Sequence, residues 1–257
     1  MISLVVVGAA GRMGRAVLET AAMVAGFEVR AGVDVGECPT WWDRSKPWSR
    51  DLNAVLTPGD VVVEFSGAEG AVAAARACAG RGVALVSGAT GLEPAHEQAL
   101  RQAAARVAVL RAANFSLGVL ALRRALGALL AAIPGWDVEI VERHHRAKKD
   151  SPSGTAMRLA ADVTEFRGLP ASSLRHGRLG GVGPRSAEEV GVHAVRGGTW
   201  VGDHAVLMAG EGEWIELRHV AQDRTAFARG ALAAASFVAR AAPGLYALEA
   251  VIDQSPP

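Results

Sequence analysis

The sequence predicts an α/β first domain joined to an α+β second domain. Short apolar runs alternate with alanine-rich helical segments through residues 1–116, as in a parallel sheet covered by helices. A glycine-rich turn follows the first apolar run directly. After residue 133 the pattern changes to strand-like segments separated by glycine-rich turns. We therefore expect a first domain of residues 1–116 plus 221–257. The second, residues 117–220, is expected to be built on a mostly antiparallel sheet.

Each element of the first half follows from its local pattern. The run Ile2–Val7 is almost continuously apolar, which suits a parallel strand that is buried on both faces. The segments between such runs have the hydrophobic spacing of helices. The expected strands cover residues 2–7, 27–33, 60–67, 83–87 and 107–112, and the expected helices cover residues 15–23, 69–81, 94–106 and 117–133.

The second half begins with Trp136–Glu142, where apolar and acidic residues alternate and predict a strand. Ser153-Gly154-Thr155 is a helix-capping cluster, so a helix is expected over residues 156–163. An alanine-rich helix near the C-terminus is expected to return to the first domain. The remaining elements are strands at residues 191–195, 204–210 and 213–220, and this helix at residues 224–240.

The first strand leads into Gly8-Ala9-Ala10-Gly11-Arg12-Met13-Gly14, a variant of the dinucleotide-binding fingerprint. In such a motif the first glycine allows a tight turn, and the second lets the backbone approach a pyrophosphate. The third lets the helix and strand pack closely. The pyrophosphate would then lie at the helix N-terminus. The first domain is therefore predicted to be a Rossmann-type dinucleotide-binding domain.

Asp34 ends the second expected strand, about twenty residues after the last glycine, where a ribose-binding carboxylate is expected. An ordinary βαβ unit with a capping aspartate would have the same pattern. A carboxylate near a 2′-phosphate is repelled by about a few kcal/mol, and the next residue is Val35 rather than arginine. Arg12, Arg44 or Lys46 could compensate in part. We therefore expect NADH to be used at least as well as NADPH.

Polar and glycine clusters follow the later strands at Phe65–Gly67, Gly88–Gly91 and Ala113–Phe115. The carboxyl ends of parallel strands form the ligand crevice of an open sheet. Each cluster alone is also compatible with a simple turn, but together they predict the nicotinamide end of the site. The predicted cofactor-binding residues are Gly8, Ala9, Ala10, Gly11, Arg12, Met13, Asp34, Gly88, Ala89, Thr90, Ala112, Ala113, Asn114 and Phe115.

The segment Glu142–Ala156 gathers two imidazoles, two ammonium groups and a Pro-Ser-Gly-Thr turn between a strand and a helix. Imidazole titrates near neutrality, so His144 can exchange protons. Lys148 can hold a carboxylate or support developing negative charge. The amides of Gly154 and Thr155 can bind an anion at the helix start. The alternative is a solvated, charged surface loop.

The composition limits the functional classes. The chain has 257 residues, half of them hydrophobic, and a formal net charge of +1. This suits an enzyme with two small domains and predicts no nucleic-acid partner. No apolar stretch reaches about 18 residues without a charge, so no membrane span is expected. Cys38 and Cys78 suggest neither a disulfide framework nor a metal site. No signal peptide is recognised, so a cytoplasmic location is expected.

With both motifs in view, the chain resembles the 4-hydroxy-tetrahydrodipicolinate reductase (dihydrodipicolinate reductase) family. The family pattern Glu-x-His-His-x-x-Lys-x-Asp-x-Pro-Ser-Gly-Thr-Ala is complete at residues 142–156. Gly-x-x-Gly-Arg-Met-Gly at residues 8–14 and Ala-Asn-Phe-Ser at residues 113–116 match as well. Residues 195–204 and 224–231 are also similar, so the resemblance covers essentially the whole chain.

The resemblance implies NAD(P)H-dependent reduction of a cyclic dicarboxylate, 4-hydroxy-tetrahydrodipicolinate, with loss of water in diaminopimelate and lysine biosynthesis. It also implies a homotetramer assembled through the sheets of the second domain. By the same resemblance, His144 matches the family's proton donor/acceptor and Lys148 a proton donor. His145 and the pair Gly154-Thr155 match positions that hold a substrate carboxylate.

Some positions depart from the family pattern. Ala89 stands where a threonine is common, and the segment between Asp34 and Val61 is shorter than in many members. Within that segment, Trp41, Trp42 and Trp48 could stack on adenine or pack beneath a loop. The adenosine pocket is therefore expected to be rebuilt in this chain.

Other functional classes fit less of the sequence. An acylating semialdehyde dehydrogenase needs a thiol nucleophile at a strand-to-helix junction, but Cys38 is expected in a loop and Cys78 in a helix. An amino-acid dehydrogenase does not account for the loop from Lys148 to Thr155. A nicotinamide-ratio sensor that binds DNA would need a helix-turn-helix and a basic face, and the sequence shows neither.

Overall fold

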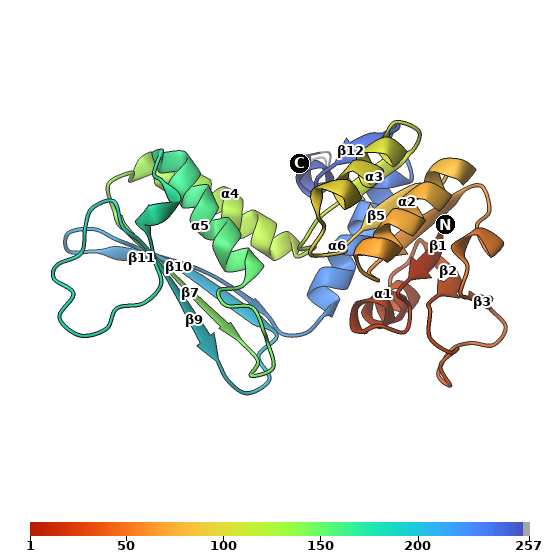
Figure 1. Ribbon diagram of the computed structural model, residues 1–257, viewed down its shortest axis with the longest axis horizontal. Helices are drawn as coiled ribbons and strands as arrows, with labels where there is room; N and C mark the ends of the chain where they lie inside the picture. The colour runs from red at the N-terminus through yellow and green to blue at the C-terminus, as the bar shows by residue number, and fades with distance from the viewer. Residues whose placement is uncertain (254–257) are drawn as a thin grey trace. The chain divides into compact units, whose positions relative to one another are not determined.

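The computed structural model describes residues 1–253, which form two compact units (Figure 1). The first comprises residues 1–116 and the segment from residue 224 onward, and the second comprises residues 117–223. The second boundary thus falls at 223/224, whereas the sequence suggested 220/221.

The first unit is built on a parallel sheet in the strand order β12-β6-β5-β4-β1-β2-β3. Strand β1 pairs with β2 on one side and β4 on the other, so the chain order reverses there. Such a reversal creates a crevice at the carboxyl ends of the strands. The bounds are β1 Ile2–Val7, β2 Phe27–Val33, β3 Trp48–Ser49, β4 Asp60–Glu64, β5 Ala84–Ser87, β6 Ala108–Arg111 and β12 Gly244–Tyr246.

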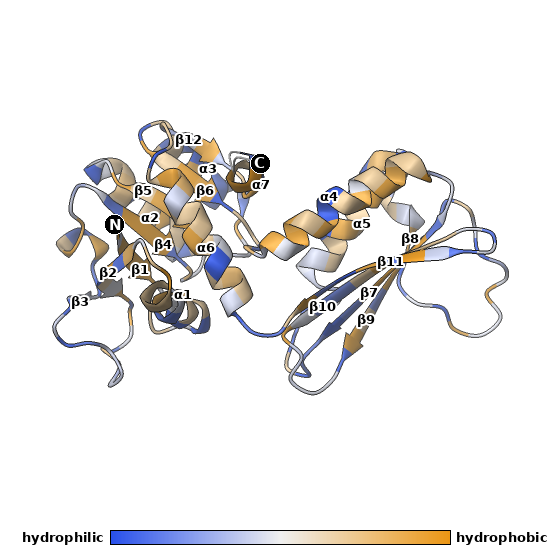
Figure 2. Cartoon of the chain, turned by 180° about the vertical axis from the view of Figure 1, so that it is seen from behind, coloured by the Kyte–Doolittle hydropathy of each residue, from blue (hydrophilic) through white to orange (hydrophobic). Residues whose placement is uncertain are grey.

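Helices cover this sheet: α2 packs with α3, and α1 packs with α6. The consecutive β1 residues Leu4, Val5 and Val6 are each 0% exposed, so both faces of the strand are buried. Figure 2 colours the central strands as hydrophobic, as a doubly covered parallel sheet requires. The bounds are α1 Arg12–Met23, η1 Leu52–Ala54, α2 Ala68–Arg81, α3 Pro94–Ala104, α6 Thr225–Val238 and α7 Glu249–Asp253.

The second unit has a five-stranded sheet in the order β11-β10-β7-β9-β8, with helices α4 and α5 packed against one face (Figure 1). Apolar residues of both helices and of the sheet form one core cluster. The bounds are α4 Leu117–Ala132, β7 Asp137–His144, α5 Gly154–Arg167, η2 Ala171–Ser173, β8 Leu174–Arg175, β9 Val190–Arg196, β10 Gly202–Ala209 and β11 Trp214–Ala221.

The prediction of a mostly antiparallel second sheet is only partly correct. Strand β10 is antiparallel to β7 and β11, but β9 is parallel to β7 and β8. The sheet is therefore mixed. The connection from β7 to β9 passes through α5, and a helical crossover of this kind returns the chain in the parallel direction.

Strand β7 has a two-faced burial pattern that determines the chemistry of each face. Val138 and Ile140 lie in the core under the helices. Because side chains alternate along a strand, Glu142 and His144 share this helix-covered face. Both are buried. Glu139, between the two core residues, lies on the opposite face.

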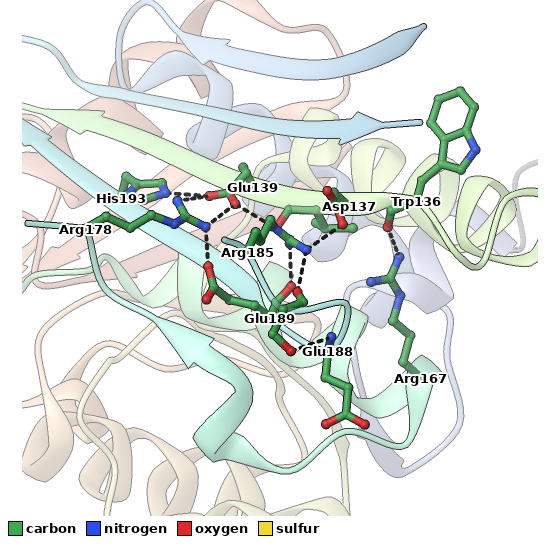
Figure 3. A network of polar contacts seen from close by, with 11 residues as sticks. Trp136, Asp137, Glu139, Arg167, Arg178, Arg185, Glu188, Glu189 and His193 are labelled. Carbon is green, nitrogen blue, oxygen red and sulfur yellow. Dashed lines mark hydrogen bonds and ion pairs between the residues drawn. The ribbon is translucent and has the colours of Figure 1, made fainter. Parts of the chain in front are cut away.

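The opposite face carries the cluster around Glu139, Arg178, Arg185 and His193 that is drawn in Figure 3. Glu139 accepts hydrogen bonds from Arg178 (2.7 Å) and Arg185 (3.1 Å) and is paired with His193 (2.6 Å). Arg178 also pairs with Glu189. Burial raises the pKa of Glu139, but the hydrogen bonds from its three partners outweigh this and lower it to about 2. The network therefore fastens the long segment between β8 and β9 to the sheet.

Candidate active site

The best-defined polar cluster of the second unit is centred on His144, the last residue of β7. Its Nδ1 lies 2.6 Å from Oε2 of Glu142, two residues earlier on the same face. Glu142 is 0% exposed and His144 is 8% exposed. A buried carboxylate needs hydrogen-bond donors or a cation to remain stable. Glu142 therefore needs further donors or a cation besides His144 to remain ionised in this buried position.

Arg196, at the end of the neighbouring strand β9, forms a bidentate pair with Glu142 at 2.8 and 2.7 Å. The amide of Ser153 donates to the same carboxylate at 3.0 Å. Ser153 is also the N-cap of α5, and its hydroxyl accepts the amide of Ala156 at 3.1 Å. Glu142 thus connects His144 to the amino end of α5.

A second imidazole completes this cluster. His204 of β10 packs edge-on against His144, with ring centroids 5.1 Å apart and an interplanar angle of 72°. Its Nε2 lies 3.0 Å from the hydroxyl of Ser153. A side chain at Gly202 would approach Nε2 of His144 to 3.3 Å, so the glycine leaves room beside that atom. Arg196 and His204 lie in the family-similar stretch 195–204 but were not predicted as site residues, because they come from strands that are distant from His144 in sequence.

The pKa directions agree with a neutral imidazole beside an ionised carboxylate. Burial lowers the pKa of His144; the Glu142 carboxylate opposes this, while the charges of Lys148 and Arg196 add to it, and the net pKa is below the usual value. Burial raises the pKa of Glu142, but hydrogen bonds from Arg196 and His144 outweigh this and lower it. Burial and the neighbouring His144 lower the pKa of His204 to about 4.

The rest of the predicted loop lies beside this cluster. The amide of His145 donates to the carbonyl of Trp200, and the amide of Lys148 donates to the carbonyl of His145. The ammonium of Lys148 lies 2.8 Å from Asp150, and its side chain is 20% exposed. Gly154 begins α5, and a side chain added there would meet no atom within 4 Å. A polar ligand can therefore approach the amino end of α5.

The first unit contains a separate pocket of about 380 Å³ at the carboxyl end of its sheet. Met13, Gly88, Ala89, Thr90, Ala113, Asn114 and Phe115 were predicted cofactor residues and line it. Phe65, Ser66, Gly67 and Phe227 also line it. Phe227, from α6, lies in the family-similar stretch 224–231 but was not predicted as a site residue, because its spacing is that of an ordinary helix. Ala112, also predicted, is buried after β6 and does not line this pocket.

The glycine loop has the backbone that the fingerprint predicts. Gly8 has φ +75°, and a side chain there would approach the carbonyl of Phe65 to 2.7 Å. A side chain at Gly14 would approach the carbonyl of Gly8 to 2.1 Å, so helix and strand pack closely. Gly11 is the N-cap of α1, without a side-chain cap, and the helix begins at Arg12 rather than at the expected Arg15. This helix start therefore suits an anion such as a pyrophosphate.

Asp34 lies against this glycine loop. Its Oδ2 accepts the amide of Ala10 and its Oδ1 accepts the amide of Gly36, both at 2.9 Å. Val35 is 86% exposed. The pairing brings Asp34 to the predicted pyrophosphate loop. A carboxylate oxygen has more than one acceptor site, so both oxygens can still accept a ribose hydroxyl.

The tryptophans of the shortened segment differ in their surroundings. Trp42 is 6% exposed and packs edge-on against Trp48, with ring centroids 5.1 Å apart. A side chain at Gly32 would meet the ring of Trp48 at 2.8 Å and the ring of Trp42 at 2.9 Å, so both rings lie directly over this glycine. Trp41 is 42% exposed, and the guanidinium of Arg15 lies 5.2 Å from its ring centroid. Trp42 and Trp48 therefore pack beneath the loop, the second of the two interpretations from the sequence.

A buried carboxylate, missed in the sequence, shapes the pocket. Glu64 ends β4 and is 0% exposed. Its carboxylate accepts the amide and hydroxyl of Ser66, the amide of Gly67 and the hydroxyl of Ser87. These bonds end β4 earlier than the predicted residue 67 and fix the backbone that lines the pocket. The polar end of this strand was the only available sequence signal.

Within residues 1–253, no helix is long and apolar enough to span a membrane. The same residues contain no group of three or more His, Cys, Asp or Glu side chains arranged to hold a metal ion. The two candidate sites are the histidine–carboxylate cluster of the second unit and the pocket beside the glycine loop of the first. Together with the fold, they define a two-domain, nicotinamide-dependent oxidoreductase.

Comparison with known proteins identifies the family. Residues 2–115 match the model described as dihydrodipicolinate reductase, N-terminus, and residues 118–252 match the corresponding C-terminus. The chain therefore belongs to the dihydrodipicolinate reductase family.

The similarity to known proteins covers almost the whole chain. The 4-hydroxy-tetrahydrodipicolinate reductase of Myxococcus xanthus (strain DK1622) is 44% identical, and the alignment covers 98% of each protein. That of Thermomicrobium roseum is 43% identical over 98% of this chain and 100% of its own length. A solved structure, dipicolinate-bound dihydrodipicolinate reductase from Paenisporosarcina sp. TG-14, is 25% identical with a TM-score of 0.80, covering 96% of this chain and 97% of that one.

Proposed function

We propose that the two candidate sites divide the work of one reaction, the NAD(P)H-dependent reduction of 4-hydroxy-tetrahydrodipicolinate to tetrahydrodipicolinate. This reaction belongs to diaminopimelate and lysine biosynthesis. It is the activity named for relatives that match this chain over its full length. The observation that carries the division is that His144, Lys148 and the amino end of α5 meet in one loop of the second unit.

The first unit binds the dinucleotide in this proposal. The uncapped start of α1 suits the pyrophosphate, and the 380 Å³ pocket suits the nicotinamide end. Reduced nicotinamide supplies a hydride to the substrate ring. The chain's own residues bind and orient the nucleotide through Asp34 and the loops that follow the strands. The carboxylate of Asp34, with no arginine after it, supports NADH as the preferred cofactor.

The second unit binds the dicarboxylate. The amides of Gly154 and Thr155, with His145, hold one carboxylate, and Lys148 supplies a positive charge and a proton. Hydride adds to the ring as the 4-hydroxyl departs, and one proton accompanies that hydroxyl to form water. Lys148 donates this single proton and His144 restores it to Lys148, because His144 is the imidazole held by a buried carboxylate.

A homotetramer is proposed to form through the helix-free face of the second sheet. Val195, Trp214 and Val220 lie on that face and are 38%, 62% and 52% exposed. These three side chains lie at separate points of the face, among charged residues, and a second copy of the sheet would bury each of them. Sedimentation analysis should give the mass of four chains. Trp214→Glu should give smaller species; a wild-type monomer would contradict the proposal.

The direct test of function is oxidation of NADH and NADPH, followed by absorbance at 340 nm. The substrate is made in situ by the preceding synthase from pyruvate and aspartate semialdehyde. Turnover should depend on the synthase, and NADH should be used at least as well as NADPH. No turnover with either nucleotide, by protein that binds NADH, would overturn the assignment and favour an amino-acid dehydrogenase.

A further inference from the structure

We propose that Glu142 is a positioning residue that holds His144 in one tautomer, leaving Nε2 as the atom that exchanges the proton. The inference deepens the proposed function and rests on it. Glu142 itself touches no reacting atom in this proposal. It acts through the imidazole that it orients.

The hydrogen shared between His144 and Glu142 belongs to the imidazole. The 2.6 Å contact joins Nδ1 of His144 to a carboxylate oxygen. Arg196 donates twice to this carboxylate and the Ser153 amide donates once, so the group is held as an acceptor. An ionised carboxylate only accepts hydrogen bonds, so Nδ1 must carry the hydrogen. In neutral His144 the lone pair is then on Nε2.

The second step is the freedom of Nε2. Within residues 1–253, no residue forms a hydrogen bond with Nε2, whereas Nδ1 is hydrogen-bonded to Glu142. Gly202 has no side chain, and the nearest position that one would occupy is 3.3 Å from Nε2. Proton exchange at Nε2 therefore leaves the bond to Glu142 in place. The ring can gain and lose its proton without rotating.

The third step is the orientation of the ring. His204 packs edge-on against His144, and its Nε2 is bonded to Ser153, which in turn donates its amide to Glu142. The four residues His144, His204, Ser153 and Glu142 thus form a closed ring of contacts. His204 is only 4% exposed, and its Nδ1 is buried without a hydrogen-bond partner among the described residues. The edge-on contact therefore places His204 to hold the His144 ring in its orientation.

Several charges face His144, and only one favours its protonation. Glu142 comes from its own strand, Arg196 from β9, His204 from β10 and Lys148 from the following loop. The cations disfavour a second proton on the ring, and the carboxylate favours it. Removal of the carboxylate charge should therefore lower the pKa of His144 and also release its tautomer.

Glu139 provides a matched control on the same strand. It too is paired with a histidine, His193, at 2.6 Å and with arginines, but on the opposite face (Figure 3). Glu139→Gln removes the same charge from the same kind of cluster. It should leave the pH profile of turnover unchanged.

The first experiment needs no turnover. Wild-type protein labelled with ¹⁵N-histidine is titrated by NMR, and the His144 signals are assigned by their loss in His144→Gln. Above the pKa of His144, Nδ1 should carry the hydrogen and Nε2 should give the signal of an unprotonated nitrogen. The reverse tautomer would overturn the proposal even if the enzyme were fully active. This outcome is distinct from failure of the proposed function, which would appear as absent wild-type turnover.

The second experiment compares turnover in Glu142→Gln and Glu139→Gln, after circular dichroism and thermal melting establish that both fold. Glu142→Gln should lower kcat by about 10- to 100-fold, part of the roughly 10²–10⁴ that a positioned acid–base group contributes. The pH limb assigned to His144 should move to lower pH, with the KM for NADH unchanged. A kcat within about threefold of wild type and an unmoved limb would overturn the proposal. If Glu142→Gln does not fold, the tautomer measurement on wild-type protein still decides.

Discussion

The two units contain buried carboxylates at comparable places, and their partners differ. Glu64 ends β4 in the first unit, and Glu142 lies near the end of β7 in the second; both are 0% exposed. The donors to Glu64 are two hydroxyls and two backbone amides. The partners of Glu142 are a guanidinium, an imidazole and one amide.

This difference separates a structural carboxylate from one that is coupled to a proton. The donors to Glu64 do not titrate near neutral pH, so its hydrogen bonds hold the pocket loops in the same way across that range. Glu142 is bonded to His144, an imidazole that can gain and lose a proton and whose pKa burial lowers below the usual value. Its interaction therefore changes with the protonation of the neighbour. Burial alone does not distinguish the two roles; the chemistry of the donors does.

The largest effect is expected from His144→Gln. Glutamine retains much of the size of the side chain but cannot exchange a proton near neutral pH. We expect kcat to fall by roughly 10²- to 10⁴-fold, while NADH binding to the first unit remains unchanged. Steady-state kinetics and calorimetric NADH binding check both parts. Activity within a few fold of wild type would remove His144 from the acid–base role.

Glu64→Gln should give the opposite pattern. Its amide nitrogen would replace one acceptor oxygen and face donors from Ser66 or Ser87, leaving a buried group unsatisfied. The free energy of unfolding should fall by about 1–3 kcal/mol, and NADH should bind more weakly because the pocket loops relax. Urea denaturation and NADH titration measure these changes. If the variant instead shifted the pH limb of kcat, the division between the two carboxylates would be wrong.

Local sequence patterns predict one part of the fold and the site, and long-range strand pairing determines the rest. The glycine loop, the parallel sheet and the loop after β7 follow from local patterns, since neighbouring residues set them. The long-range partners do not, because Arg196 reaches Glu142 and His204 reaches His144 only after strands β9 and β10 pair beside β7. The strands β3, β8 and β12 were also missed, because segments of two or three residues show no alternation.

The contribution of Glu139 to the stability of the fold should decrease gradually in acid. Its pKa falls from an ordinary 4.5 to about 2 in the folded protein, so it adds stability above about pH 4.5 that is lost as the pH falls toward 2. Glu139→Gln removes this contribution, and about 1 kcal/mol for a partly exposed ion-pair cluster corresponds to a Tm lower by roughly 2–4 °C at neutral pH. The difference between variant and wild type should shrink in melts from pH 5 to pH 2. A constant difference would mean that Glu139 is not the titrating group.

The smallest effect is expected at the adenosine end, from Val35→Arg. Val35 is 86% exposed and follows Asp34, so a guanidinium there can reach a 2′-phosphate without disturbing the core. An exposed ion pair contributes less than about 1 kcal/mol, which corresponds to a gain of about two- to fivefold in the NADPH-to-NADH ratio of kcat/KM. Val35→Met adds similar length without charge and should leave the ratio unchanged. An equal change in both variants would assign the effect to size, and no change in either would mean that Asp34 and Val35 do not read the ribose.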